Sequence, residues 1–191
     1  MHVKDLIHNY EIGALEPIKR HCTQFLDESG GFPVVKNLPQ AYNDFQKVKV
    51  RRRKHTNTFS STFNVAFKDE VTDLRERSIF ANGMASVECD ITENAEPFYI
   101  FPINGYKFLY SKEVYDSTEE YKQVFEAIFD KLGETSGKDI FTDLLRFTYI
   151  SEDMSIGIES GAELIIYGIP YYYAIREAQV DSYDELLTTF I

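Results

Sequence analysis

Six cationic residues lie close together in the sequence near residue 50, and their type and spacing indicate a site that could bind an anionic ligand. They are Lys47, Lys49, Arg51, Arg52, Arg53 and Lys54. Guanidinium groups match phosphate and carboxylate groups through paired hydrogen bonds, so such a ligand is one interpretation of the run. Val48 and Val50 alternate with the charges, which predicts a strand with one buried face, and Arg52 falls on that face. A charge there requires a partner or a ligand. The alternative is a solvated strand edge, on which charges prevent unwanted pairing.

A second candidate group is the carboxylate of Glu163. It precedes three consecutive aliphatic residues, Leu164, Ile165 and Ile166, which are typical of a strand covered on both faces. A carboxylate at the first residue of such a strand either faces solvent or has a functional role. Residues 133–138 (GETSGK) lack the spacing of a phosphate-binding P-loop, and we predict only a polar loop there.

An α+β fold must position these groups, because strand-like runs cluster apart from helical ones, without regular βαβ alternation. We expect a mostly antiparallel, strongly twisted sheet with strands near 47–53, 78–82, 98–110, 163–168 and 171–176. Asn104-Gly105 predicts a two-residue hairpin turn within 98–110. The interval 31–46, which contains two prolines, is predicted to be a connection.

Apolar residues at helical spacing predict helices over 15–26, 58–72, 117–132 and 139–150, and a short closing helix in the tail 180–191. Ser117 and Glu120 have the spacing of a capping box at the start of the third of these helices. Gly133 is expected to end that helix.

Charge is distributed unevenly over the 191 residues, which carry a net charge of −11. Residues 1–95 contain 13 Lys and Arg against 13 Asp and Glu, whereas residues 96–191 contain 7 against 18. The acidic half makes nonspecific binding to nucleic acid unfavourable and permits binding to a basic partner. The sequence has no signal peptide or apolar run long enough for a membrane span, so we expect a soluble, cytoplasmic protein. Cys22 and Cys89 are expected to be buried thiols, and no spacing indicates a metal site.

Four motifs, in this order along the chain, carry a resemblance to a known family: Arg51-Arg52-Arg53-Lys54-His55-Thr56, Arg77-Ser78-Ile79-Phe80-Ala81-Asn82-Gly83, Phe101-Pro102-Ile103-Asn104-Gly105-Tyr106 and Ser160-Gly161-Ala162-Glu163-Leu164-Ile165-Ile166. They resemble a set of phage-encoded proteins with a pattern similar to the ADP-ribosyltransferase fold. The resemblance covers about residues 47–176. It implies an ADP-ribosyltransferase-like α+β domain over 47–191, preceded by a helical segment and connection over 1–46, in one compact unit.

The resemblance also implies roles for particular residues in binding NAD as a substrate. Arg51 or Arg52 would hold the NAD phosphates or ribose, and Ser78 or Asn82 would shape the nicotinamide pocket. Glu163 would be the catalytic carboxylate, which stabilises the positive charge that develops on the ribose as nicotinamide leaves. Aromatic side chains such as Phe101 and Tyr106 would stack on the nicotinamide ring or pack in the core.

Two positions depart from the family pattern. Phe80-Ala81-Asn82-Gly83 stands where the family commonly has Ser-Thr-Ser, and Gly161 stands where many members have the Glu or Gln that helps select the acceptor. Three functions therefore remain open, and two of them are specific. One is an NAD-dependent mono-ADP-ribosyltransferase acting in the host cell on a host macromolecule. The other is an inactive acidic protein that binds and inhibits a host defence nuclease or polymerase, and a virion structural part is a third, less specific possibility.

Overall fold

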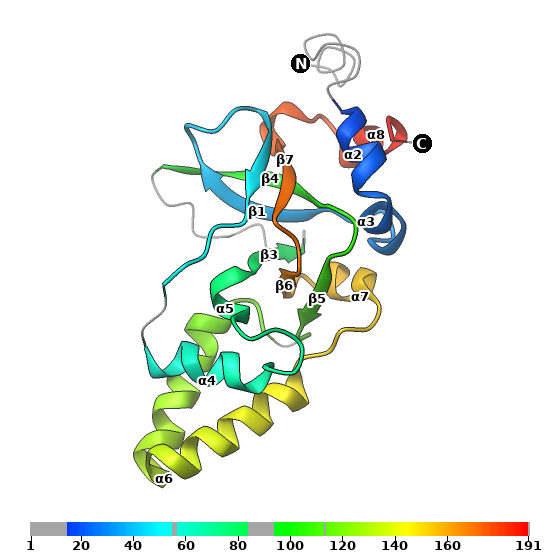
Figure 1. Ribbon diagram of the computed structural model, residues 1–191. Helices are drawn as coiled ribbons and strands as arrows, with labels where there is room; N and C mark the ends of the chain where they lie inside the picture. Colours follow the sequence, from blue (N-terminus) through cyan, green and yellow to red (C-terminus); the bar gives the residue numbers. More distant parts are fainter. Residues whose placement is uncertain (1–14, 55–56, 84–93, 113, 191) are drawn as a thin grey trace.

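Seven antiparallel strands form one sheet in the computed structural model, which describes residues 15–54, 57–83, 94–112 and 114–190. The strand order is β2-β7-β4-β1-β3-β6-β5 (Figure 1). The strands are β1 (Val34–Pro39), β2 (Phe45–Lys49), β3 (Ile79–Gly83), β4 (Ala95–Pro102), β5 (Lys107–Tyr110), β6 (Glu163–Tyr167) and β7 (Tyr171–Arg176). The helices are α2 (Glu16–His21), α3 (Thr23–Glu28), α4 (Thr58–Ala66), α5 (Leu74–Arg77), α6 (Ser117–Thr148), α7 (Met154–Glu159), the short 3-10 helix η2 (Glu177–Gln179) and α8 (Tyr183–Thr188). The predicted α+β class and antiparallel sheet are confirmed.

The sheet has two parts that meet at a short junction between β1 and β3. These strands pair at two positions, Val34 with Gly83 and Val35 with Asn82. Beyond Val35, β1 continues along β4 as far as Pro39, while the rest of β3 pairs with β6. The two strands therefore diverge, and the sheet opens between them.

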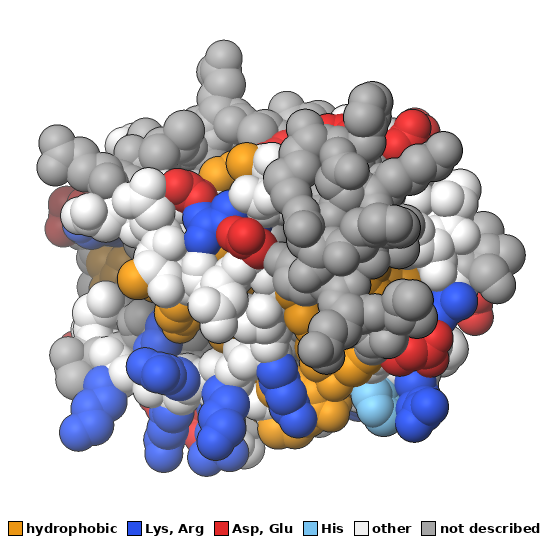
Figure 2. Space-filling model, turned by 90° about the horizontal axis from the view of Figure 1, so that it is seen from above, with side chains coloured by type: hydrophobic (Ala, Val, Ile, Leu, Met, Phe, Trp, Pro, Cys, Tyr) orange, Lys and Arg blue, Asp and Glu red, His pale blue; other side chains and the backbone are white. Residues whose placement is uncertain are grey.

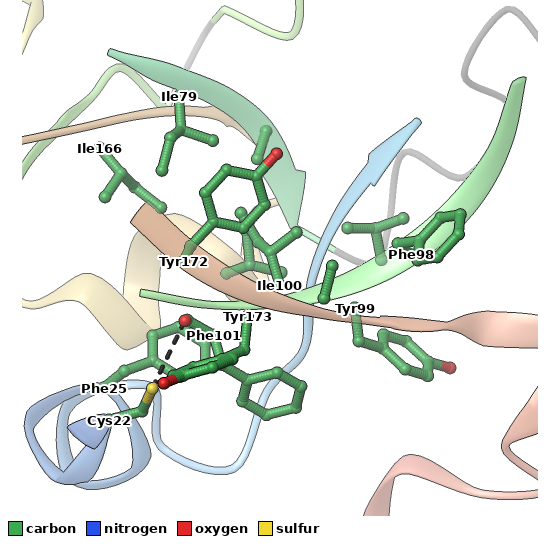
Figure 3. Close-up of a cluster of buried hydrophobic side chains, with 14 of the residues drawn as sticks. Cys22, Phe25, Ile79, Phe98, Tyr99, Ile100, Phe101, Ile166, Tyr172 and Tyr173 are labelled. Atoms are coloured by element: carbon green, nitrogen blue, oxygen red, sulfur yellow. Dashed lines mark hydrogen bonds between the residues drawn. The ribbon is translucent and has the colours of Figure 1, made fainter. Parts of the chain in front are cut away.

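One core packs α2, α3, α7 and α8 against the larger part of the sheet, β2-β7-β4-β1, and continues onto β3 and β6. Alternation along β7 sends Tyr172 and Tyr173 to opposite sides of the strand, and Tyr173 lies on the same side as Phe101 (Figure 3). Phe101 contacts aromatic rings of α3 and of the chain end, Phe25 and Phe190. The expected closing helix is therefore confirmed as α8, which docks on this core.

Cys22 lies fully buried in the same core, and its thiol donates a hydrogen bond to the carbonyl of Phe101 (Figure 3). Burial raises the pKa of this thiol to about 12. The expectation of a buried thiol is confirmed for Cys22, while Cys89 lies outside the described residues.

A second core packs α4 and α6 against β3, β6 and β5. Within α6 the chain reverses at Gly133, whose φ of 75° and ψ of 173° are not helical, so that α6 is a hairpin of two helical arms. The arms are antiparallel, because the Tyr121 hydroxyl bonds the Thr148 hydroxyl at 2.8 Å and Phe125 packs on Phe141 with ring centroids 5.0 Å apart. The helix predicted over 117–132 and its end at Gly133 are confirmed.

The prediction of a polar loop at 133–138 is wrong, since residues 134–148 form the second arm of α6. Gly137 is needed there for close packing rather than for a loop: a Cβ atom on Gly137 would lie 2.9 Å from a ring carbon of Phe129 on the facing arm. A glycine that two helices require for contact resembles, in the sequence alone, a glycine that ends a helix.

The predicted connection over 31–46 is also wrong, because it contains β1, which lies in the middle of the sheet. Pro33 precedes this strand and Pro39 is its last residue, where the loss of a backbone donor costs little. The prolines therefore bracket a strand. β2 ends at Lys49 rather than near residue 53, and α4 ends at Ala66.

Asn104-Gly105 forms a turn, but the predicted hairpin is wrong. β4 pairs with β1 and β7, whereas β5 pairs with β6, so the chain passes at this turn from one part of the sheet to the other. The polar groups of the turn bind the helical layer instead. The Gln24 N–H donates to Asn104 Oδ1 at 3.0 Å, and the Asn104 N–H donates to the His21 carbonyl at 2.6 Å.

The capping residue of α6 is Asp116 rather than Ser117. Asp116 Oδ1 accepts from the N–H groups of Thr118 and Glu119, and Glu120 accepts from the N–H of Asp116. The capping interactions thus exist one residue earlier than predicted, and Ser117 lies inside the helix and is buried. In the described part of the chain, none of the helices combines the length and apolar character needed to cross a membrane.

Candidate functional site

The divergence of β1 and β3 opens a pocket of about 450 Å³, which we call the basic pocket. Its lining residues are Lys36, Asn37, Leu38, Pro39, Tyr42, Val48, Lys49, Val50, Arg51, Arg52, Arg53, Ser78, Ile79 and Tyr172. They come from β1, from the end of β2 and the extended chain after it, from the start of β3, and from β7. The volume is within the range of small-molecule sites.

Five cationic residues line the basic pocket, but they are not equally available to a ligand. Lys36 donates to the backbone carbonyl of Phe80 across the gap between the two strands. Arg52 Nε donates to Glu76 Oε2 at 2.6 Å, and Asp73 lies 3.5 Å from its Nη2. Arg52 lies beyond the end of β2 and its side chain is 57% exposed, so the prediction that it falls on the buried face of a strand is wrong. Its carboxylate partners, Glu76 and Asp73, belong to α5 and its N-cap.

Arg51, Arg53 and Lys49 differ from Arg52 because none of them forms an ion pair with another described residue. Arg53 is held by its backbone, whose N–H donates to the Glu76 carbonyl at 2.9 Å. Basic side chains are also unevenly placed on the surface. On the face seen in Figure 2, Lys and Arg gather along one edge. The lining of the basic pocket contains five cationic residues and no Asp or Glu, so positive charge is concentrated there in a molecule whose net charge is −11.

Ser78 contributes a buried hydroxyl to the basic pocket. It is 4% exposed, and its Oγ has no hydrogen-bond partner among the described residues. A buried polar atom without a partner is uncommon in folded proteins and marks a place where a ligand or water would bind. Tyr172 lines the pocket as well. Burial raises the pKa of its hydroxyl, and the positive charge of nearby Arg53 acts in the opposite direction.

Glu163 is not a lining residue of the basic pocket. It pairs with Asn82 across β6 and β3, is 7% exposed, and accepts a hydrogen bond at 3.3 Å from the N–H of Ser117 at the start of α6. The expectation of a solvent-facing carboxylate does not hold for this residue. Burial raises the pKa of Glu163 to about 7, against the opposing effects of Ser117 and the charge of Arg75.

Arg75 is a buried cation whose charge acts on Glu163, and no sequence pattern indicated it. Its Nη1 donates to the Ser117 hydroxyl and its Nη2 to the Thr118 hydroxyl, each at 2.7 Å. The guanidinium also lies over the ring of Phe80, with the centroid at 4.7 Å. Burial lowers the pKa of Arg75, and the charge of Glu163 is the main effect that opposes this.

Arg75, Ser117, Thr118 and Glu163 together form what we call the Arg75–Glu163 cluster. Arg75 and Glu163 are not in direct contact within 4 Å, and Ser117 connects them. Arg75 Nε is buried without a hydrogen-bond partner in the described residues. The cluster attaches the first turn of α6 to β6.

The residues predicted for one NAD site thus lie in three places. Arg51, Arg52 and Ser78 line the basic pocket. Asn82 lies opposite Glu163 and donates to the Tyr115 carbonyl at 2.8 Å. Tyr106 is in the core on the α3 side, where its hydroxyl donates to Glu28.

Five cationic or aromatic residues that line the pocket were not predicted from the sequence as individual site residues: Lys36, Tyr42, Lys49, Arg53 and Tyr172. Arg53 stood in the basic run, whereas Lys36 was hidden in the predicted connection. No group of three or more His, Cys, Asp or Glu side chains suited to a metal ion occurs within residues 15–54, 57–83, 94–112 and 114–190.

Comparison with protein-family models, curated proteins and solved structures finds no match for this chain. The function is therefore argued from the geometry of the two sites.

Proposed function

We propose that the protein binds a small phosphate-bearing ligand in the basic pocket. The observation that carries this proposal is the buried hydroxyl of Ser78, which has no hydrogen-bond partner among the described residues and belongs to a residue that lines the same pocket as five cationic residues. Arg51 and Arg53 supply donors suited to phosphate oxygens, and a hydroxyl such as that of Ser78 adds a neutral donor.

NAD is the ligand that the resemblance to ADP-ribosyltransferases favours, and its pyrophosphate fits the chemistry of the pocket. The positive charge would bind the two phosphates. Tyr42 and Tyr172 line the same pocket and offer aromatic surface for a base or nicotinamide ring. A proposed ADP-ribosyltransferase-like fold is compatible with the antiparallel sheet.

ADP-ribosyl transfer requires more than NAD binding, because the catalytic carboxylate must also contact the ribose. Glu163 faces Ser117 and Asn82 rather than the basic pocket. The geometry therefore supports ligand binding more directly than transfer, and the two activities need separate tests.

Ligand binding is tested by thermal unfolding with NAD, ADP-ribose, inorganic pyrophosphate and nicotinamide. A ligand that binds only the folded protein stabilises it by RT ln(1 + [L]/Kd), or about 2.7 kcal/mol at 100 times Kd, which raises Tm by about 5 °C. We expect this shift with the three phosphate-bearing compounds and none with nicotinamide.

The double variant Arg51→Ala/Arg53→Ala should lose the shift. The matched control is Lys122→Ala/Lys131→Ala, which removes the same charge from exposed positions on α6 and should keep it. A flat titration of the wild type up to millimolar NAD and pyrophosphate would refute binding. Transfer is tested separately, by release of nicotinamide from NAD. Equal release by the wild type and Glu163→Gln would exclude Glu163 as the catalytic group.

A further inference from the structure

The α6 hairpin exposes apolar side chains that the rest of the described structure does not cover. Val124 and Leu132 on the first arm are 40% and 48% exposed, and Ile140 and Phe147 on the second arm are 47% and 86% exposed. Single exposed apolar residues are common on proteins, but a phenylalanine that is 86% exposed within a regular helix is not.

These residues form one face. Val124, Ile128 and Leu132 recur every four residues along the first arm, while Ile140, Leu144 and Phe147 recur at spacings of four and three along the second. The exposed members of the two stripes, Val124, Leu132, Ile140 and Phe147, are treated as one side of the hairpin, while Ile128 and Leu144 between them are partly buried against the second core. We call this side the apolar face.

Phe147 lies beside the contact between α4 and the hairpin and takes no part in it. Helix α4 contacts the hairpin through Phe59, which packs on Phe125 and Phe141, and through the Ala66 carbonyl, which accepts from Arg146. Arg146 precedes Phe147, and one helical step turns the side chain by about 100°. Figure 1 shows the hairpin extending away from the sheet, with α4 lying beside it.

The hairpin around the apolar face is acidic. Residues 117–148 carry seven Asp and Glu against four Lys and Arg. Two of the four cations are already engaged, because Lys138 pairs with Glu134 at 2.5 Å and Arg146 bonds α4. Each arm has about 16 residues and is therefore about 24 Å long, which matches a partner helix of similar length.

We propose that the apolar face binds an amphipathic helix of a partner protein, with apolar side chains on one side and Lys or Arg beside them. Apolar contacts of Phe147 and Ile140 would supply most of the affinity, and the acidic residues would select a basic partner and speed association. A second copy of this chain is less suited to the face, since two acidic hairpins would repel each other.

The test uses a fluorescently labelled 18-residue peptide of leucine and lysine, with leucines at helical spacing, and measures binding to the full chain by anisotropy. A second peptide has the same composition with the leucines scrambled, so that it has the same charge and no apolar face. We expect the first peptide to bind at least about tenfold more tightly than the second. Phe147→Ser should remove that preference, while Phe32→Ser, at an exposed phenylalanine outside α6, should preserve it.

Three outcomes would overturn the proposal. Equal affinity for the two peptides would mean that charge alone attracts them. An unchanged preference in Phe147→Ser would place the binding elsewhere. A wild-type dimer in sedimentation velocity that Phe147→Ser converts to monomer would show that a second copy occupies the face. Circular dichroism of the variants confirms that Phe147→Ser remains folded, and Ile140→Asn provides a second variant of the same face.

Discussion

Glu163→Gln should alter the pH dependence of stability in a direction that distinguishes a buried neutral group from a permanently ionised one. Burial raises the pKa of Glu163 to about 7 from the ordinary value of 4.5. The folded protein therefore holds a proton on this carboxyl group between about pH 4.5 and 7, where the unfolded chain has released it. Stability contributed by this group is present at low pH and falls as the pH rises through this window.

The magnitude follows from the size of the shift. A difference of one unit in pKa corresponds to about 1.4 kcal/mol, so a shift from 4.5 to about 7 costs the folded state about 3 kcal/mol above pH 7. Glutamine keeps the size of the side chain and an oxygen that accepts from the Ser117 N–H, and it cannot ionise. The Glu163→Gln variant should therefore not lose this stability as the pH rises.

Urea unfolding at several pH values between 4.5 and 8.5 measures the effect. The free energy of unfolding of Glu163→Gln minus that of the wild type should increase by about 3 kcal/mol across this range, and the subtraction removes the titration of groups that both proteins share. Glu159→Gln, at an exposed position on α7, is the matched control and should differ from the wild type by less than about 0.5 kcal/mol. A difference that stays flat, or that decreases with pH, would refute the reasoning, because Arg75 and the start of α6 would then hold Glu163 ionised.

Further predictions concern packing, an ion-pair network and a thiol. Gly83→Ala should destabilise the protein by about 3 kcal/mol or more in urea unfolding, because a Cβ atom there would collide with the backbone carbonyl of Ile158. Arg176→Met should cost about 2 kcal/mol by the same measurement, since it removes hydrogen bonds and ion pairs to Asp44 and Glu96 from a side chain that is 11% exposed. In a Cys89→Ser background, Cys22 should react with a thiol reagent at pH 8 only after unfolding, because it is buried and its pKa is about 12.

Sequence patterns predicted those elements that are defined by their own residues. The strand from Leu164 to Ile166 and the first arm of α6 were recognisable because apolar periodicity reports burial directly. β1 was not recognisable, since Pro33 and Pro39 at its ends resemble turn residues. Its central place in the sheet depends on pairing with β4 and β3, which no local pattern encodes.

The candidate site was predictable to a similar extent. The basic run was interpreted as a possible site for a phosphate or carboxylate ligand, and Arg51 does line a pocket, together with Ser78, which only the family resemblance had indicated. The sequence did not distinguish Arg75 from Arg77, although the first is 6% exposed and the second lies at the surface. That difference arises because α5 turns only one of the two toward Ser117, and it depends on the tertiary position of α6.

The strand order has a consequence for how the chain folds. Among the described strands, β5 and β6 are the one pair of sheet neighbours that are also consecutive in the chain, and α6 and α7 separate even these. Each strand pairing therefore closes a long loop, a topology that slows folding and prolongs the exposure of unpaired edges. β7 is the last strand to leave the ribosome, yet it lies between β2 and β4. A chain that ends before Tyr171 leaves β2 without a strand partner in the sheet, so such truncations should aggregate or remain bound to chaperones instead of forming a smaller native domain.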